Sequence, residues 1–338
     1  MNGPDTLSDS TAWLPGAGNG RLFVRRWVSA KPDKSRALLQ IVHGMAEHSL
    51  RYERLARRLN ARGIEVWAMD LRGHGHTADP KVNDPAWGGL PGHCADQDGF
   101  SLVTKDIHTL NQHIAEQRPG LPLFLLGHSW GSFLVQNYIE TYGASAPRLS
   151  GCILSGTRGP GGFKIRAGVP VMALLSRLAG PRRYSALSRA IADGPYNKPF
   201  RPNRTPFDWL SRDNGEVDAF VRDPLCGMPC SAGFYRDLIA LLDRIHRPER
   251  MERIDRRLPV YIFSGSSDPV GDMGASPAAL VDAYRAMGID KLEFVLYPNA
   301  RHEPLNETNR EEVMDNLLTW IEKCMSPPPE ENRQIRDR

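Results

Sequence analysis

The pentapeptide GHSWG, residues 127–131, is the part of the sequence whose residue types and spacing best fit a chemical role. It follows the apolar run at residues 121–126 and precedes a helical pattern, so the serine lies at a sharp turn from a strand into a helix. Such a turn strains the serine backbone, and the glycines two positions to either side relieve the clash that larger side chains would make. The helix N-terminus below the hydroxyl favours developing negative charge. The pattern therefore predicts that Ser129 is a nucleophile.

A serine hydroxyl needs a base to react at neutral pH, and that base needs a carboxylate to orient it. His302 is the candidate base because it follows the strand pattern at residues 292–298, in the loop NARHEPLNE. Asp268 is the candidate carboxylate because it lies just after the strand pattern at residues 258–265, and Asp272 in the same loop is the less favoured alternative. The order serine, aspartate, histidine along the chain is one that catalytic triads use.

Backbone N–H groups are the expected donors to the oxyanion that forms when a serine attacks a carbonyl, because they are fixed before the reaction begins. Trp130, the residue after the nucleophile, supplies one such group in this arrangement. Met45 is the candidate for the other because it follows the strand pattern at residues 36–44, and Gly44 gives the chain its close approach. Only the main chain of the two donors matters for this role.

Strands and helices alternate along the parts of the chain that carry these residues. This order favours an α/β protein with a mostly parallel sheet and helices on both faces. The strand patterns lie at residues 20–28, 36–44, 64–73, 121–128, 149–156, 258–265 and 292–298. The helical patterns lie at residues 52–63, 99–117, 131–143 and 308–323.

The gap between the fifth and sixth strand patterns is the unusual feature of this order. It spans roughly 100 residues, where connections between elements commonly have fewer than 12, so we expect an inserted subdomain. We predict the following divisions of the chain: a core at 18–156 and 231–324, a cap at 157–230, and disordered ends at 1–17 and 325–338.

The predicted cap is more basic than the rest of the chain. Residues 158–223 contain 12 Lys and Arg against 6 Asp and Glu, a surplus of +6, whereas the whole chain has a net charge of +4. This surplus fits a solvated face, and it equally fits attraction to a phosphate-bearing substrate or a membrane surface. Peripheral contact of the cap with a membrane is therefore one hypothesis. The stretch VMALLSRL at residues 171–178 and the loop around Phe163 are candidates for an acyl channel or for an ordinary cap core.

Composition argues against several other classes of protein. A net charge of +4 over 338 residues, without a nucleic-acid-binding motif, gives no argument for nucleic acid. The N-terminus has no basic segment followed by an apolar one, and no apolar run is long enough for a membrane span. Five cysteines at irregular spacing indicate reduced thiols in a cytoplasmic protein. Cys226 and Cys230 lack a second Cys or His pair at matching spacing, so no metal is expected.

Five motifs occur in the order and spacing of the α/β-hydrolase superfamily, and they resemble those of its monoacylglycerol lipase and lysophospholipase branch. The motifs are HGMAEHSLRY (43–52), DLRGHGHT (70–77), GHSWGS (127–132), SGSSDPV (264–270) and NARHEPLNE (299–307). The resemblance covers residues 20–323 and implies an α/β-hydrolase fold, with a mostly parallel eight-stranded sheet and helices on both faces. It also implies a helical cap that is inserted after strand 6 and lies over the active site.

The resemblance assigns roles to individual residues. It implies Ser129 as the nucleophile, His302 as the base and Asp268 as its partner, with the N–H groups of Met45 and Trp130 as the oxyanion hole. The candidate substrate-binding residues are His43, Gly44, Glu47, Arg51 and His128. Among these, Glu47 and Arg51 form a polar network near the head-group end in that branch. GMAEHS stands where the branch often has GAGEHS, and the side chains of Met45 and Ala46 narrow the loop in this sequence.

The predicted function is two-step hydrolysis of a lipid-like carboxylic ester, a monoacylglycerol or a lysophospholipid, without a metal or another cofactor. A serine aminopeptidase of the same fold is an alternative, with Asp193, Asp208 and Glu216 as candidate amine-binding carboxylates. A thioesterase or acyltransferase would use the same catalytic residues. A non-catalytic binding member of the fold is the alternative from another class. The sequence leaves the oligomeric state open.

Overall fold

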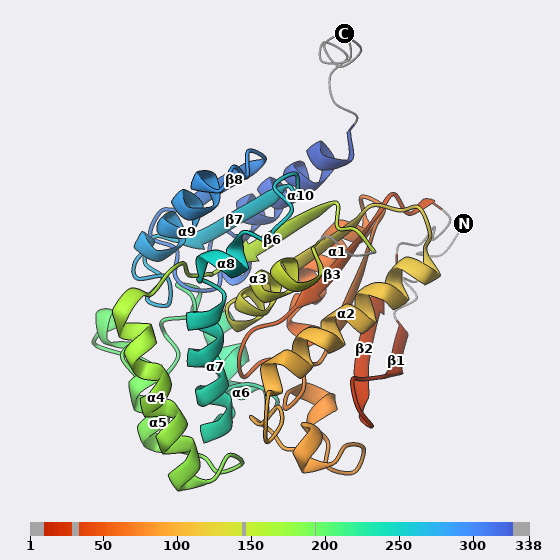
Figure 1. Ribbon diagram of the computed structural model, residues 1–338. Coiled ribbons are helices and arrows are strands. Elements are labelled where there is room, and N and C mark those ends of the chain that lie inside the picture. Colours follow the sequence, from red (N-terminus) through yellow and green to blue (C-terminus); the bar gives the residue numbers. More distant parts are fainter. Residues whose placement is uncertain (1–9, 29–33, 144–146, 193, 327–338) are drawn as a thin grey trace.

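An eight-stranded sheet forms the centre of the protein (Figure 1). The computed structural model describes residues 10–28, 34–143, 147–192 and 194–326. The strands lie in the order β1-β2-β4-β3-β5-β6-β7-β8, with antiparallel pairing for β1–β2 and β2–β4 and parallel pairing for the others. Their bounds are β1 Ser10–Pro15, β2 Arg21–Trp27, β3 Ala37–Val42, β4 Ile64–Met69, β5 Leu123–His128, β6 Gly151–Ser155, β7 Val260–Gly265 and β8 Leu292–Tyr297. The predicted mostly parallel, eight-stranded fold is confirmed.

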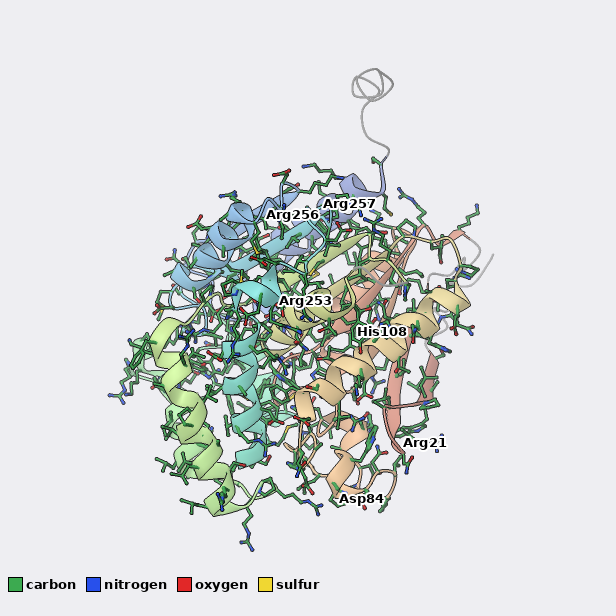
Figure 2. All side chains as sticks on the ribbon, in the orientation of Figure 1. Arg21, Asp84, His108, Arg253, Arg256 and Arg257 are labelled. Atoms are coloured by element: carbon green, nitrogen blue, oxygen red, sulfur yellow. The ribbon has the colours of Figure 1, made fainter. Side chains whose placement is uncertain are left out.

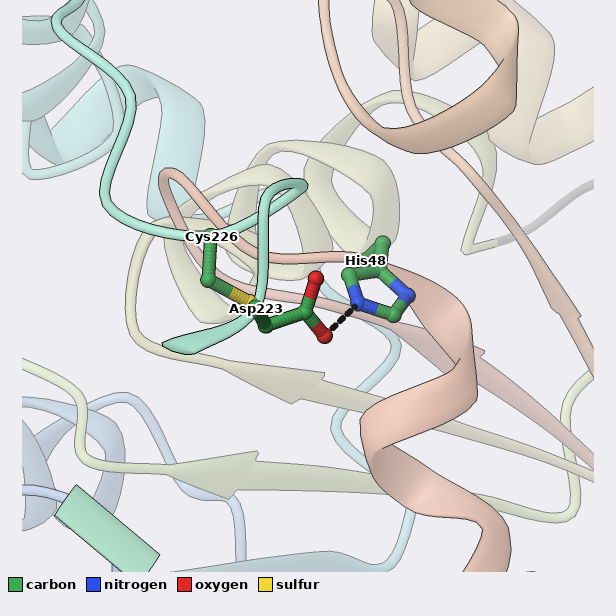
Figure 3. A group of neighbouring side chains, drawn as sticks. All are labelled: His48, Asp223 and Cys226. Atoms are coloured by element: carbon green, nitrogen blue, oxygen red, sulfur yellow. Dashed lines mark hydrogen bonds and ion pairs between the residues drawn. The ribbon is translucent and has the colours of Figure 1, made fainter. Parts of the chain in front are cut away.

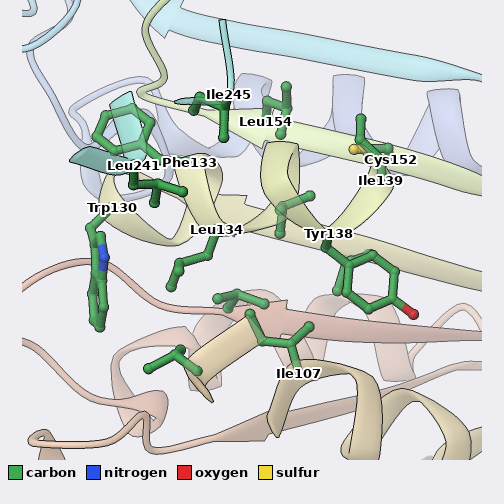
Figure 4. Packing of buried hydrophobic residues seen from close by; sticks show 14 of the residues in the cluster. Ile107, Trp130, Phe133, Leu134, Tyr138, Ile139, Cys152, Leu154, Leu241 and Ile245 are labelled. Carbon is green, nitrogen blue, oxygen red and sulfur yellow. The ribbon is translucent and has the colours of Figure 1, made fainter. Parts of the chain in front are cut away.

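Helices cover both faces of this sheet, and each face has its own apolar cluster. In β3 the alternation of side chains divides the strand between them, because Leu38 packs into one cluster and Leu39 into the other. The first cluster includes residues of α2, α3, α7 and α9, and Figure 4 shows Ile107 of α2 and Leu134 of α3 packed within it. The second cluster includes residues of α1 and α10. The bounds of these helices are α1 Glu53–Asn60, α2 Gly99–Gln117, α3 Trp130–Tyr142, α7 Ala232–Arg244, α9 Ala275–Ala286 and α10 Arg310–Met325.

The N-terminal end of the chain departs from the expectation. We expected residues 1–17 to be disordered, but residues 10–15 form β1, which pairs with β2 along its whole length. Trp13 packs against Phe23 with ring centroids 5.3 Å apart, so the partner strand stabilises a segment whose own sequence has little apolar patterning. The expectation is wrong for residues 10–15, and residues 1–9 lie outside the described residues. At the other end α10 includes Met325, while residues 327–338 lie outside the described residues.

The predicted insertion lies between β6 and β7. It contains α4 Gly162–Ala179, α5 Ala186–Ala192, α6 Asn214–Arg222, α7 and α8 Pro248–Met251. The predicted cap boundary at residue 230 falls just before α7, which contacts α4 of the cap as well as α2 and α3 of the core. In Figure 1 α4, α5 and α7 lie together at one end of the sheet. The short 3-10 helices are Ser49–Tyr52, Gly75–Ala78, Pro85–Trp87, Lys198–Phe200 and Pro304–Asn306.

The surface of the protein carries exposed arginines, and its cysteines form no disulfides. Arginines such as Arg253, Arg256 and Arg257, which follow α8, project from the core (Figure 2). All five cysteines are free thiols. Among the described residues, no helix combines the length and the apolar character that crossing a membrane requires.

Candidate active site

Ser129 lies at a strained turn between β5 and α3. Its φ of 53° and ψ of −124° are unusual for a residue with a side chain. A Cβ on Gly127 would lie 2.4 Å from the carbonyl oxygen of Gly131, and a Cβ on Gly131 would lie 2.2 Å from that of Val42. The turn therefore requires glycine at both positions, as the pentapeptide predicted. Because α3 begins at Trp130, the serine lies at the helix N-terminus.

The structure brings Ser129, His302 and Asp268 into one hydrogen-bonded chain. His302 Nε2 lies 2.7 Å from Ser129 Oγ, and His302 Nδ1 lies 2.9 Å from Asp268 Oδ1. Asp268 also accepts hydrogen bonds from the Val270 N–H, at 2.8 Å, and from the Ser264 hydroxyl, at 3.1 Å. Each carboxylate oxygen of Asp268 is therefore held in place by at least one hydrogen bond from a buried group. Asp272, the alternative carboxylate, is not part of this chain of contacts.

The electrostatics of the pair suit a base that is held in one orientation. Burial alone would raise the pKa of Asp268, but His302 and the hydrogen bonds to the carboxylate lower it overall. Burial alone would lower the pKa of His302, but Asp268 outweighs it and raises the pKa above its ordinary value. An ionised Asp268 can therefore stabilise the imidazolium that forms when His302 takes a proton from Ser129.

Both residues predicted to supply the oxyanion donors lie next to Ser129. Trp130 is the first residue of α3, a position whose N–H has no partner inside the helix. Met45 lines the same cavity as Ser129. A Cβ on Gly44 would lie 3.3 Å from the Cβ of Ser129, so the loop passes close to the serine. This placement is compatible with the predicted oxyanion hole.

A buried ionic network supports the loop that carries Gly44 and Met45. It includes Glu303, to which the sequence had assigned no role. Glu47 accepts hydrogen bonds from the Gly44 N–H and from the Tyr52 hydroxyl. Arg51 donates to Glu47 at 2.8 Å and to both carboxylate oxygens of Glu303 at 2.7 and 2.8 Å. Burial alone would raise the pKa of Glu47, but Arg51, together with smaller effects of the nearby histidines and the Gly44 N–H, lowers the pKa to about 2. The network therefore joins the oxyanion loop to the residue after His302.

The predicted substrate-binding residues fall into two groups. Gly44, Glu47 and His128 line the cavity at Ser129, whereas His43 and Arg51 lie behind its wall. His43 holds backbone instead: its Nδ1 donates to the Gly44 carbonyl at 2.8 Å, and its Nε2 accepts from the Leu71 N–H at 2.9 Å. His128 packs against His302, with ring centroids 4.9 Å apart. Burial, together with nearby His302, lowers the pKa of His128 to about 4.

Two cavities of different character meet at Ser129. The first, which we call the polar cavity, has a volume of about 570 Å³ including its open mouth. Glu47, Glu303 and His128 form its polar wall, and most of its other lining residues are apolar. The second, of about 360 Å³, is mainly apolar and is lined by Met45, Ser129, Trp130, Phe133, Tyr196, Trp209, Tyr235, Leu238 and Val270. Trp209 of the cap contributes to both cavities and packs against His302, with ring centroids 5.0 Å apart.

The predicted acyl channel is wrong in its position. Phe163, Leu174 and Leu178 are exposed, and none of them lines a cavity at Ser129. Met172 of α4 is instead buried and Leu175 packs against the same apolar cluster, as the alternative of an ordinary cap core predicted. An amphipathic pattern identifies an apolar face but not the surface on which that face packs.

The carboxylates proposed for amine binding are not presented to the site. Asp208 accepts hydrogen bonds from Thr205 and from the Arg204 N–H, and Glu216 pairs with Arg54. Neither residue lines the cavities at Ser129. Asp193, the third candidate, lies outside the described residues.

The sheet order and the strained serine turn define an α/β-hydrolase. Residues 33–309 match the family described as serine aminopeptidase, S33, and the chain belongs to this family. It is 32% identical over 272 residues to a monoglyceride lipase of Homo sapiens, an alignment that covers 77% of this chain and 73% of that protein. It is 29% identical over 310 residues to a monoacylglycerol lipase of Mycolicibacterium smegmatis, with 90% and 94% covered.

A solved structure gives the same grouping. The thermostable carboxyl esterase from Bacillus coagulans, solved in complex with glycerol, superposes with a TM-score of 0.84 at 27% identity. The match covers 95% of this chain and 100% of the esterase chain. The relatives and this structure group the chain with the carboxylic ester hydrolases, and the resemblance to monoacylglycerol lipases is confirmed.

Proposed function

We propose that this protein hydrolyses a lipid-like ester, a monoacylglycerol or a lysophospholipid, through an acyl-enzyme formed on Ser129. The observation that carries the proposal is the hydrogen-bonded chain from Ser129 through His302 to Asp268, at which a cavity with one polar wall and a second, mainly apolar cavity meet. An ester with a small polar alcohol and a long acyl chain has the same two-sided character. Relatives named monoacylglycerol and monoglyceride lipase support the same substrate class.

The reaction would proceed in two steps. His302 takes the proton of Ser129 as the hydroxyl attacks the ester carbonyl, and the N–H groups of Met45 and Trp130 stabilise the oxyanion. His302 then gives that proton to the departing alcohol, which leaves an acyl group on Ser129. A water molecule, activated by the same histidine, releases the acid and restores the serine.

The two cavities would divide the substrate between them. The acyl chain would lie in the apolar cavity against Phe133 and Leu238, because transfer of each methylene from water contributes about 0.8 kcal/mol. The alcohol would leave through the polar cavity, past Glu47 and His128. Trp209 would separate the two halves of the substrate.

An aminopeptidase is the second candidate because the matching family carries that description. The amine of such a substrate would need a carboxylate that is free to bind it. Glu47 and Glu303 line the polar cavity, but both already pair with Arg51. The contacts therefore favour ester hydrolysis. Thioesters and acyl transfer would use the same residues, so only turnover separates them.

The outer face of the cap would meet the surface on which such lipids lie. On α4, Phe163 is 82% exposed and Leu178 is 75% exposed. Leu187 and Ile191 on α5 are also exposed, and the cap carries a surplus of positive charge. Apolar side chains beside basic ones are typical of elements that bind an anionic lipid surface. We place the protein in the cytoplasm on the basis of its five free thiols.

Replacement of Ser129 by alanine tests the proposed function. Ser129→Ala should lower kcat by roughly 10⁴-fold or more on monoacylglycerols and on short nitrophenyl esters, with an unchanged Tm. A panel of monoacylglycerols, lysophospholipids, acyl thioesters and aminoacyl amides, assayed with the unmodified protein, identifies the substrate class. Undiminished turnover in the variant would rule out the nucleophile, and preference for the amides would favour the aminopeptidase.

A further inference from the structure

A second group of reactive side chains lies beside the active site, where the loop after β3 meets the segment after α6. His48, Asp223 and Cys226 each offer one ligand atom, and these atoms lie within 4.8 Å of one another. Figure 3 shows the imidazole and the carboxylate in contact, with Cys226 next to Asp223. His48 Nε2 and Asp223 Oδ2 are 2.8 Å apart. The His48 side chain is 3% exposed and that of Asp223 is 31% exposed, so an ion could enter from the aspartate side.

We propose that His48, Asp223 and Cys226 bind a divalent cation of the zinc class, with water as the fourth ligand. An imidazole nitrogen, a carboxylate oxygen and a thiolate sulfur form a donor set that Zn²⁺ accepts, and hard cations such as Mg²⁺ avoid the sulfur. Ligand bonds of about 2.0–2.3 Å in tetrahedral geometry require the Cys226 sulfur to approach the other two atoms by up to about 1 Å, and the His48–Asp223 contact of 2.8 Å to open by roughly 0.5 Å. Side-chain rotation can supply such a movement because Asp223 and Cys226 are only partly buried.

The charges around the thiol favour a cation. The groups that act on Cys226 are the carboxylates of Glu47, Asp223 and Glu303 and the guanidinium of Arg51, which are three negative charges against one positive. Burial and the carboxylates raise the pKa of the Cys226 thiol above its ordinary value, so the thiol is protonated at neutral pH. Binding breaks the S–H bond, forms the sulfur–metal bond and releases one proton to water. His48 binds as the neutral imidazole, with its remaining proton on Nδ1.

The position of the group connects it to the oxyanion loop. The Gly227 N–H donates to the Ala46 carbonyl at 2.8 Å, so the segment of Cys226 already contacts the residue after Met45. A bound ion would add a second link between the cap and this loop. The group could not be recognised in the sequence because His48 and Asp223 are 175 positions apart. Cys230, the cysteine nearest to Cys226 along the chain, is buried in the apolar core and is not part of the group.

Titration of the tag-free, full-length protein with Cd²⁺ tests the proposal. The unmodified protein should show a saturable ultraviolet thiolate-to-cadmium absorption band at one equivalent, and Zn²⁺ should displace the Cd²⁺ and raise the Tm. Cys226→Ala should abolish the band, and Asp223→Asn should weaken binding by roughly 10- to 100-fold. Cys324→Ala is the matched control, since Cys324 is also a partly buried thiol but lies on α10, away from the group.

The outcomes separate clearly. A band that is lost in Cys226→Ala and kept in Cys324→Ala supports the site. The absence of a saturable band in the unmodified protein, or its survival in Cys226→Ala, overturns it. Each variant is first shown to keep the Tm of the metal-free protein, so that misfolding is recognised. No substrate is present, so the result does not depend on the proposed hydrolysis.

Discussion

The strand ends around Ser129 and the outer face of the cap differ in the burial of their side chains. Asp268 and His302 are buried, the hydrogen bond between them lies in the core, and His302 reaches Ser129 at the floor of the cavities. On α4 and α5, by contrast, large apolar side chains such as Phe163 and Leu178 are exposed. The first region is positioned by backbone that has little freedom to move. The second presents apolar surface that the chain itself leaves uncovered.

This difference separates the two parts of the proposed function. Reactions at a carbonyl require atoms fixed to within a fraction of an ångström, and the core supplies that precision. Selection of a lipid depends on apolar surface and on cavity shape, which α4 and residues such as Trp209 and Leu238 supply. Substitutions in the core should therefore change the reaction on every substrate, and those in the cap or at the apolar cavity should change only some.

The largest effect is expected at Asp268. Asp268→Asn keeps the size of the side chain but removes the charge that holds His302 in the reactive tautomer, so kcat should fall by about 10⁴-fold on short and long esters alike. Asp272→Asn is the control, because Asp272 lies in the same loop and outside the hydrogen-bonded chain. Steady-state kinetics on butyryl and dodecanoyl nitrophenyl esters measure the effect. A larger loss in the control would move the role to Asp272.

The residues at the strand ends could be predicted from the sequence, whereas the apolar cavity beneath the cap could not. Ser129, His302 and Asp268 could be located because each follows directly from the end of a strand, and strand patterns are readable in the sequence. Glu303 could not be recognised because its partner Arg51 is 252 positions away, although its place directly after His302 was a usable signal. The apolar cavity was misplaced because the pattern on α4 does not reveal that its buried residues, such as Met172, pack on α7 and the core cluster instead of lining a cavity at Ser129.

The second effect concerns the apolar cavity and should depend on the substrate. Leu238 of α7 lines this cavity, and Leu238→Trp would fill it. We expect kcat/KM to fall by roughly 10- to 100-fold for a dodecanoyl ester, because several methylenes worth about 0.8 kcal/mol each lose their place. The butyryl ester should change by less than about threefold. Ile239→Trp, on the next residue of the same helix, is the control. Equal losses on both esters would argue against an acyl chain in this cavity.

The third effect concerns only the membrane surface. The double substitution Leu174→Glu with Leu178→Glu, at two exposed positions of α4, should weaken binding to anionic phosphatidylglycerol vesicles by roughly 30-fold, since each leucine would lose about 1 kcal/mol of contact with lipid. Turnover of a soluble butyryl ester should be unchanged. Val82→Glu is the control, because Val82 is also exposed but lies outside the cap. Vesicle flotation at increasing salt measures both contributions, and binding that is unaffected by salt and by the α4 changes would remove the cap from this role.

The smallest effect tests whether the ionic network of the core acts on His302. His302 must be neutral to take the serine proton, and its pKa lies above the ordinary value, so kcat/KM should fall as the pH drops through a value above 6.5. Burial lowers this pKa, whereas Asp268 and, to a smaller extent, Glu303 raise it. Glu303→Gln removes one negative charge, which lowers the pKa and moves the acidic limb of the profile to lower pH.

The shift should be smaller than one pH unit, because Arg51 already balances part of the Glu303 charge. The variant should therefore keep a larger fraction of its own maximal kcat/KM at mildly acidic pH. Glu311→Gln at the exposed start of α10 should leave the profile in place. An unmoved limb in Glu303→Gln would mean that Glu303 only holds the loop, and a limb moved to higher pH would contradict the electrostatic role. The unmoved limb would leave control of the His302 pKa to Asp268 and Glu47.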